Sequence, residues 1–100
     1  MTSKYARRRD ALQTRRDNLA RHLGIYVVDL WQAAQFVPGL PDALWATLGH
    51  AVLCEHKNGD EPLTTDEAKF HAAYPGPIDI CRSDGDVERI AQEHLGVRIT

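Results

Sequence analysis

The stretch 41-PDALWATLGHAVLCEHK-57 decides the fold, because it contains two apolar runs separated by one short turn. The first run covers residues 42–47 and the second covers residues 50–57. We expect the two runs to pair as a β-hairpin with Leu48 and Gly49 as its turn residues. This turn sets the register of the hairpin, so that the numbers of facing residues always sum to 97.

The predicted register brings three charged residues to one face of the hairpin. Asp42 lies directly opposite Glu55, with Cβ atoms roughly 4.5–5.5 Å apart. Because side chains alternate along a strand, Lys57 lies on the same face as Glu55. Two like charges in facing positions destabilise a sheet, so a compensating interaction is expected at this end of the hairpin.

The residues leave four explanations open for this charged group. The two carboxyl groups can share a proton, which raises the pKa of one of them. Lys57 can act as their counter-charge, or an exposed hairpin end can carry ordinary salt bridges. The fourth explanation is a divalent cation, since Mg²⁺ is commonly held by one or two carboxylates together with water and substrate phosphate.

The flanking sequence predicts an α/β fold, in which helices pack on a central mixed sheet. Residues 50–82 form a strand, a helix and a strand, which is the pattern of a crossover between parallel strands. Thr64 and Glu67 have the spacing of a capping box, and Ser83 is a predicted helix N-cap. The expected order is helix, three strands, helix, strand and helix, with helices over residues 4–23, 64–74 and 84–95, and flanking strands over residues 25–31 and 78–82.

Composition indicates a single globular domain over residues 1–100, with 43% hydrophobic and 26% charged residues. No apolar run has the roughly 18 residues of a membrane span, and no apolar segment follows the basic N-terminus. We therefore expect no membrane association and a cytoplasmic location. Cys54 and Cys81 have no metal-ligand spacing, so two reduced core cysteines are expected.

Charge is distributed unevenly along the chain. Residues 1–24 carry seven basic and two acidic groups, whereas the remaining residues carry five basic and twelve acidic groups. A basic helix on an acidic body suggests a polyanionic partner that is bound through one face. The alternative is a solvated helix that happens to be rich in arginine, and composition alone does not separate the two.

The motif formed by "PD", twelve residues and "EHK" resembles the core motif of the PD-(D/E)XK nuclease superfamily. The resemblance extends over residues 39–90 through "GLPD", "EHKNG", "LTTDEAKFH" and a strand that ends in "RS". This wider pattern resembles the small phage and bacterial VRR-NUC and Holliday-junction-resolvase-like nucleases. This resemblance implies a restriction-endonuclease-like core, with residues 1–24 as a basic N-terminal helix.

The same resemblance implies roles for individual residues. Asp42, Glu55 and the backbone carbonyl of His56 would hold Mg²⁺ or Mn²⁺, and Lys57 would orient the attacking water and stabilise developing charge. The His56 side chain should point to the opposite face. Accessory positions near the site would be Gln13, Glu67 and His71, and phosphates would be bound by Arg7, Arg8, Arg9, Arg15 and Arg16.

The expected function is metal-dependent hydrolysis of phosphodiester bonds in DNA, selective for Holliday junctions or other branched structures and carried out by a homodimer in the cytoplasm of a bacterium or a phage-infected host. The sequence also departs from the pattern of these nucleases. Relatives often carry a glutamate on the first helix, where this chain has Arg15. The alternative is therefore a weakly active or inactive nuclease-fold module that binds DNA or another partner.

Overall fold

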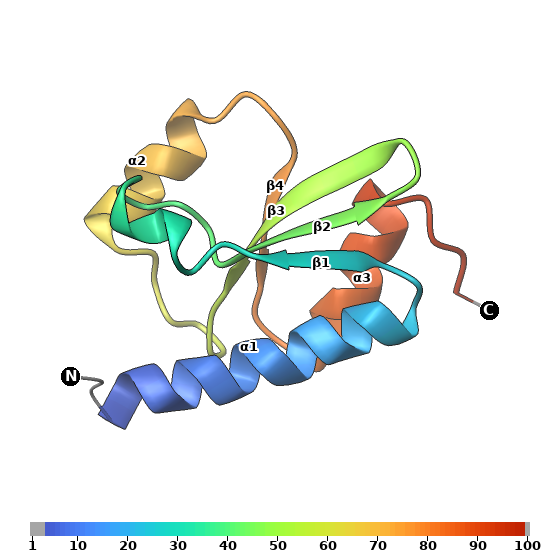
Figure 1. The fold of residues 1–100 in the computed structure, drawn as a ribbon, viewed down its shortest axis with the longest axis horizontal. Coiled ribbons are helices and arrows are strands. Elements are labelled where there is room, and N and C mark those ends of the chain that lie inside the picture. Colours follow the sequence, from blue (N-terminus) through green and yellow to red (C-terminus); the bar gives the residue numbers. More distant parts are fainter. Residues whose placement is uncertain (1–3, 100) are drawn as a thin grey trace.

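The computed structural model describes residues 4–99, with side chains from residue 11 onward, and has three helices around a four-stranded mixed sheet (Figure 1). The predicted order of helices and strands is confirmed, and a short 3₁₀ helix is added between the first two strands. The elements are α1 (Lys4–His22), β1 (Tyr26–Asp29), η1 (Ala33–Gln35), β2 (Ala43–Thr47), β3 (His50–His56), α2 (Thr65–Ala73), β4 (Ile78–Cys81) and α3 (Asp84–His94).

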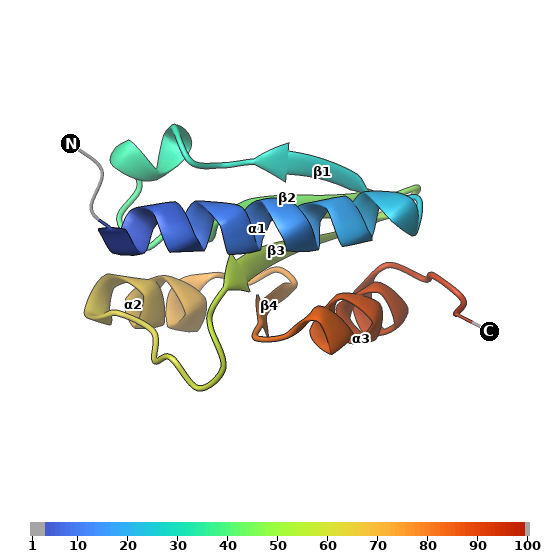
Figure 2. The same cartoon turned by 90° about the horizontal axis from the view of Figure 1, so that it is seen from below.

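The strands lie side by side in the order β1-β2-β3-β4, with β1 and β4 at the two edges. The first three strands are antiparallel, and the β2–β3 pair has the predicted register, with Thr47 facing His50 and Leu44 facing Leu53. β4 runs parallel to β3, so α2 lies in the crossover that was expected between them. Figure 2 shows α2 and α3 one after the other along the molecule, with β4 between them.

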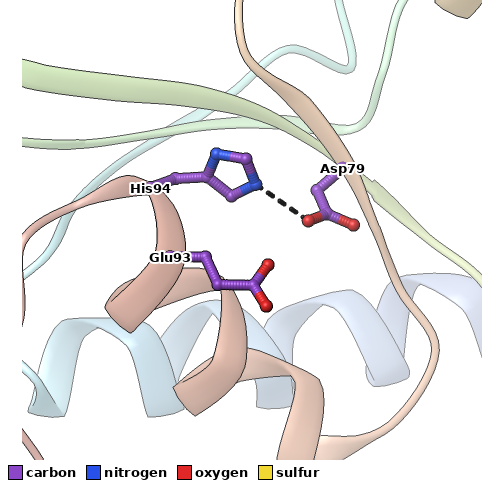
Figure 3. Close-up of side chains that lie close together, drawn as sticks. All are labelled: Asp79, Glu93 and His94. Carbon is purple, nitrogen blue, oxygen red and sulfur yellow. Dashed lines mark hydrogen bonds and ion pairs between the residues drawn. The ribbon is translucent and has the colours of Figure 1, made fainter.

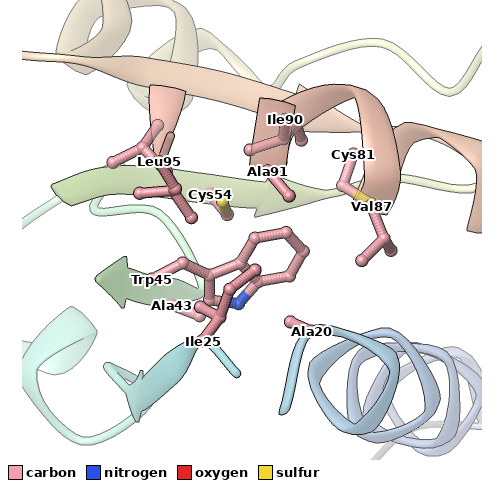
Figure 4. Packing of buried hydrophobic residues seen from close by; sticks show 11 residues of the cluster. Ala20, Ile25, Ala43, Trp45, Cys54, Cys81, Val87, Ile90, Ala91 and Leu95 are labelled. Carbon is pink, nitrogen blue, oxygen red and sulfur yellow. The ribbon is translucent and has the colours of Figure 1, made fainter. Parts of the chain in front are cut away.

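The two faces of the hairpin have different surroundings. One face carries Trp45, Val52 and Cys54 and packs against α1 and α3, where the main hydrophobic core forms (Figure 4). The other face carries Leu44, Leu53 and Glu55, and at the Glu55 end it meets side chains of α2. Cys54 and Cys81 are buried free thiols, as predicted. Within residues 4–99, every helix is too short or too polar to cross a bilayer.

The helix ends follow the signals in the sequence. α1 ends at His22 and is followed by a Schellman motif centred on Gly24, in which the N–H groups of Gly24 and Ile25 donate to the carbonyl oxygens of Arg21 and Ala20, respectively. The capping box at the start of α2 is present in full, and the Ser83 hydroxyl accepts a hydrogen bond from Asp86 at the start of α3. The capping box fixes where α2 begins, and with it the position of Glu67.

Gly39 holds the β1–β2 connection against α2. Its φ of +79° favours glycine, and an added Cβ would lie 2.1 Å from the backbone oxygen of Asp66. We expect Gly39→Ala to lower the free energy of unfolding by about 1–3 kcal/mol more than Gly49→Ala. Gly49 is the matched control, because its φ is +83° and an added Cβ there would meet open space. Urea denaturation of both variants would contradict this account if they lose equal stability.

Candidate metal and nucleic-acid site

Asp42 and Glu55 meet at the end of the hairpin that is farthest from its turn. Asp42 directly precedes β2, and one of its carboxylate oxygens accepts a hydrogen bond from the backbone N–H of His56 at 2.7 Å. Its backbone carbonyl accepts hydrogen bonds from Leu30 N–H at 3.0 Å and from Gln13 Nε2 at 3.3 Å. The neighbouring strand and α1 thus hold Asp42 across from Glu55, as the hairpin register predicts.

Glu55 is fully buried. Burial raises its pKa far above the ordinary value of 4.5, and a hydrogen bond with Asp42 and the charges of Asp42 and Glu67 add to the effect, while Lys57 opposes it. A carboxyl group in this setting favours its protonated form at neutral pH when no metal ion is bound. Of the explanations left open by the sequence, the hydrogen bond between Asp42 and Glu55 favours proton sharing in the metal-free protein, and it is compatible with later binding of a cation.

Lys57 is buried and lies between two carboxylates. Its Nζ donates to Glu67 Oε1 at 2.7 Å and lies 3.6 Å from Glu61 Oε2. Burial alone would raise the pKa of Glu67, but hydrogen bonds from Lys57 and from the Thr64 N–H outweigh burial and lower it. Glu67 therefore makes two contacts with one carboxylate. It completes the capping box that its spacing from Thr64 predicts, and it binds the ammonium group of Lys57.

His71 approaches the site from the next turn of α2. Its Nε2 lies 3.8 Å from Glu55 Oε1, and burial lowers its pKa, so that the neutral imidazole is favoured near pH 7. The structure thus brings all three accessory residues of the sequence analysis to the group formed by Asp42, Glu55 and Lys57. Gln13 contacts Asp42, His71 faces Glu55, and Glu67 binds the neighbouring Lys57.

The side chain of His56 points to the opposite face of the sheet, as predicted. Its Nε2 lies 3.1 Å from Asp17 Oδ1, which also accepts a hydrogen bond from Trp45 Nε1 at 2.9 Å. The Trp45 and His56 rings lie 5.7 Å apart. Asp17 is a buried acid that the sequence analysis missed. Its spacing from Gln13 and Ala20 is the signal that could have identified the face of α1 turned toward the sheet.

Arg16 is buried, contrary to its expected role in phosphate binding. It is 3% exposed, and its guanidinium donates to the backbone oxygens of Lys57 at 2.6 Å and Cys81 at 2.8 Å. In this position it has no surface to offer to a phosphate. Arg15 is 68% exposed and pairs with Asp84. Arg7, Arg8 and Arg9 lie in the first turns of α1, and their side chains are outside the described residues.

A second polar cluster lies at the edge strand β4, where Asp79 meets His94 and Glu93 of α3 (Figure 3). Asp79 accepts hydrogen bonds from His94 Nε2 at 2.9 Å and from both terminal nitrogens of Arg89, at 2.9 and 3.1 Å. Arg89 also donates to Glu93 at 3.1 Å. A guanidinium already neutralises the carboxylates of this cluster, so it works as an ion-pair network that docks α3 on β4. The sequence did not single it out, because nothing in its spacing joins Asp79 to His94.

Comparisons of the chain with protein-family models, with curated proteins and with solved structures gave no match. The function is therefore inferred from the arrangement of the residues around Asp42 and Glu55.

Proposed function

We propose that this protein is a metal-dependent nuclease that hydrolyses phosphodiester bonds in DNA, and that its sheet and helices form a restriction-endonuclease-like core. The observation that carries the proposal is the pair formed by a half-buried Asp42 and a fully buried Glu55, beside a buried Lys57. Burying the Glu55 carboxyl group next to a second carboxyl group is costly, and an ordinary structural core has no need of it. The cost is explained if the pair serves to hold a cation.

The donor set fits Mg²⁺ or Mn²⁺. Asp42 and Glu55 offer carboxylate oxygens, and the backbone carbonyl of His56 would be a third oxygen ligand of the kind that these hard cations prefer. When bound, the cation would polarise the phosphoryl oxygen and lower the pKa of a coordinated water. Glu55 would give up its proton as the cation binds, because the added positive charge favours the carboxylate form.

Lys57 would stabilise the negative charge that develops on the phosphate and orient the attacking water. Glu67 is a positioning residue in this scheme, since its contact at 2.7 Å holds the lysine ammonium beside the carboxyl pair. Phosphates on either side of the cleaved bond would be held by Arg15 and by the arginines of the first turns of α1, Arg7, Arg8 and Arg9. We further propose branched DNA as substrate, a homodimer as the active form, and the cytoplasm as its location.

Cleavage assays test this function directly. The protein is incubated with a four-way junction, a flap, single-stranded DNA and linear duplex, each with Mg²⁺, with Mn²⁺ or with EDTA. We expect metal-dependent cleavage of at least one of these substrates, and a loss of at least about a hundredfold in Asp42→Asn and Lys57→Ala. Matched controls are Asp60→Asn and Lys69→Ala, which change exposed residues of the same types.

Circular dichroism spectra and urea denaturation of the Lys57 variant keep loss of folding apart from loss of activity. Asp42→Asn preserves the shape of the side chain and gives a second, independent result. Cleavage by both site variants at the rate of the unmodified protein would overturn the assignment of the site.

The ion pairs of Lys57 favour one alternative function, a nuclease-fold module that binds nucleic acid without cleaving it. Glu67 and Glu61 already compensate the lysine charge, and Arg15 stands where relatives often carry a further acid. Such a module would bind the DNA substrates in EDTA and leave all four of them intact in the presence of either metal.

A further inference from the structure

The connection between β1 and β2 presents two aromatic side chains to solvent. Trp31 is 63% exposed and Phe36 is 83% exposed, and all residues from 31 to 38 are exposed to solvent. Large aromatic side chains normally bury most of their surface, so two of them on one short connection indicate a contact surface. Phe36 and its neighbour Val37 are therefore exposed rather than packed.

This connection is held in place. The N–H of Trp31 donates to Asp29 Oδ1 at 2.9 Å, and the N–H of Phe36 donates to the Ala33 carbonyl at 3.0 Å. Farther along, Gly39 packs tightly on the backbone of Asp66 at the start of α2. The two rings are therefore presented on a hydrogen-bonded backbone, which lowers the entropic cost of binding a flat partner.

The connection is also continuous with the candidate site. Leu30, directly before Trp31, donates its N–H to the Asp42 carbonyl at 3.0 Å. Trp31 and Gln13 line the same cavity of about 230 Å³, and Gln13 Nε2 donates to that same carbonyl oxygen. In both views the first turns of α1, which carry Arg7, Arg8 and Arg9, lie at the end of the molecule that holds η1 (Figures 1 and 2).

We propose that Trp31 and Phe36 form a stacking platform for unpaired bases of nucleic acid whose backbone enters the Asp42–Glu55 site. This inference rests on the proposed nuclease function and names its substrate class, which is DNA with a single-stranded segment. Bases inside a duplex are stacked on each other and cannot meet a protein ring face, whereas unpaired bases stack readily on aromatic side chains. The basic start of α1 is the charge complement that a phosphate backbone requires.

The chain carries its own probe for this platform. It has two tryptophans, and Trp45 is fully buried, so a ligand that stacks on the surface changes the fluorescence of Trp31. The full-length protein is titrated in EDTA with a dT₂₀ oligonucleotide and with a blunt duplex of equal length. We expect dT₂₀ to quench the emission of the unmodified protein and to leave that of Trp31→Phe unchanged. The blunt duplex should quench neither.

Affinity is measured by anisotropy of a labelled oligonucleotide. The double variant Trp31→Ala/Phe36→Ala should bind dT₂₀ about tenfold or more weakly, with duplex affinity unchanged. Leu48→Ala is the matched control, because Leu48 is a fully exposed apolar residue at the opposite end of the hairpin and its loss should have no effect. Equal dT₂₀ affinity of the double variant and the unmodified protein would overturn the platform.

Analytical ultracentrifugation of the same variants tests the competing occupant, a second copy of the chain. A change in oligomeric state with unchanged dT₂₀ affinity would assign the aromatic residues to self-association and overturn the proposal. The binding assay contains no divalent cation, so it is independent of cleavage. Quenching by dT₂₀ without any cleavage would support the platform and contradict the nuclease function. Cleavage without quenching would support the nuclease function and contradict the platform.

Discussion

Replacing Glu55 with glutamine should abolish metal-dependent cleavage and stabilise the metal-free protein increasingly as the pH rises. The folded state binds a proton at Glu55 more tightly than the unfolded chain does, because burial raises the pKa of Glu55 in the folded protein. The stabilising contribution of that proton is complete below the ordinary pKa of 4.5 and is lost as the pH rises through the higher pKa of the folded state. Glutamine stays neutral and retains the shape of the protonated acid.

Urea denaturation in EDTA at pH 5 and pH 8 measures this effect. From pH 5 to pH 8, the free energy of unfolding of Glu55→Gln should increase relative to that of the unmodified protein by on the order of 2 kcal/mol. Glu88→Gln, which changes an exposed acid on α3, should follow the unmodified protein. Parallel pH profiles for the Glu55 variant and the unmodified protein would contradict the buried, protonated carboxyl group.

Two adjacent arginines should respond very differently to substitution by alanine. Arg16 makes two hydrogen bonds to backbone oxygens at the ends of β3 and β4, and its loss leaves both of these buried acceptors without their charged donor. We expect Arg16→Ala to lower the free energy of unfolding by about 3 kcal/mol or more. Arg15→Ala removes an exposed ion pair with Asp84 and should cost less than about 1 kcal/mol.

DNA binding should show the opposite order for these two arginines. Both variants lose one positive charge, so the loss of long-range attraction is the same for each. Of the two arginines, only Arg15 has the exposure needed to contact a phosphate, so Arg15→Ala should lower the salt dependence of DNA binding by about one ion. Arg16→Lys, which keeps the charge, should preserve that salt dependence. Equal losses of stability in Arg15→Ala and Arg16→Ala would show that the buried contacts of Arg16 contribute little.

The hairpin could be predicted from the sequence in detail. Placing the turn at Leu48 and Gly49 set the pairing of Thr47 with His50, and pairing and side-chain alternation together located Asp42 opposite Glu55. Local rules suffice here, because a two-residue turn leaves a hairpin little freedom of register. The helix caps at Thr64 and Ser83 follow from equally local chemistry.

The burial of two charged residues of α1 could not be predicted in this way. Leu19 and Ala20 of α1 and the adjacent Leu23 pack against the core, as apolar residues at helical spacing predict, but Arg16 and Asp17 are buried as well. Two of these residues are charged, and each is buried because a partner from a distant part of the chain satisfies it, through the backbone oxygens of β3 and β4 or through Trp45 and His56. Such pairings depend on the tertiary packing, and helical spacing alone does not identify the distant partners.

Calorimetric titration with Mn²⁺ is the most direct measurement of the central claim, that Asp42 and Glu55 together form a cation site. The unmodified protein and Asp42→Asn are compared at pH 7.5, each with and without DNA. We predict a saturable binding heat for the unmodified protein that is lost in Asp42→Asn. Absence of any binding heat in the unmodified protein, with DNA as well as without it, would contradict the claim, as would equal binding by the two proteins.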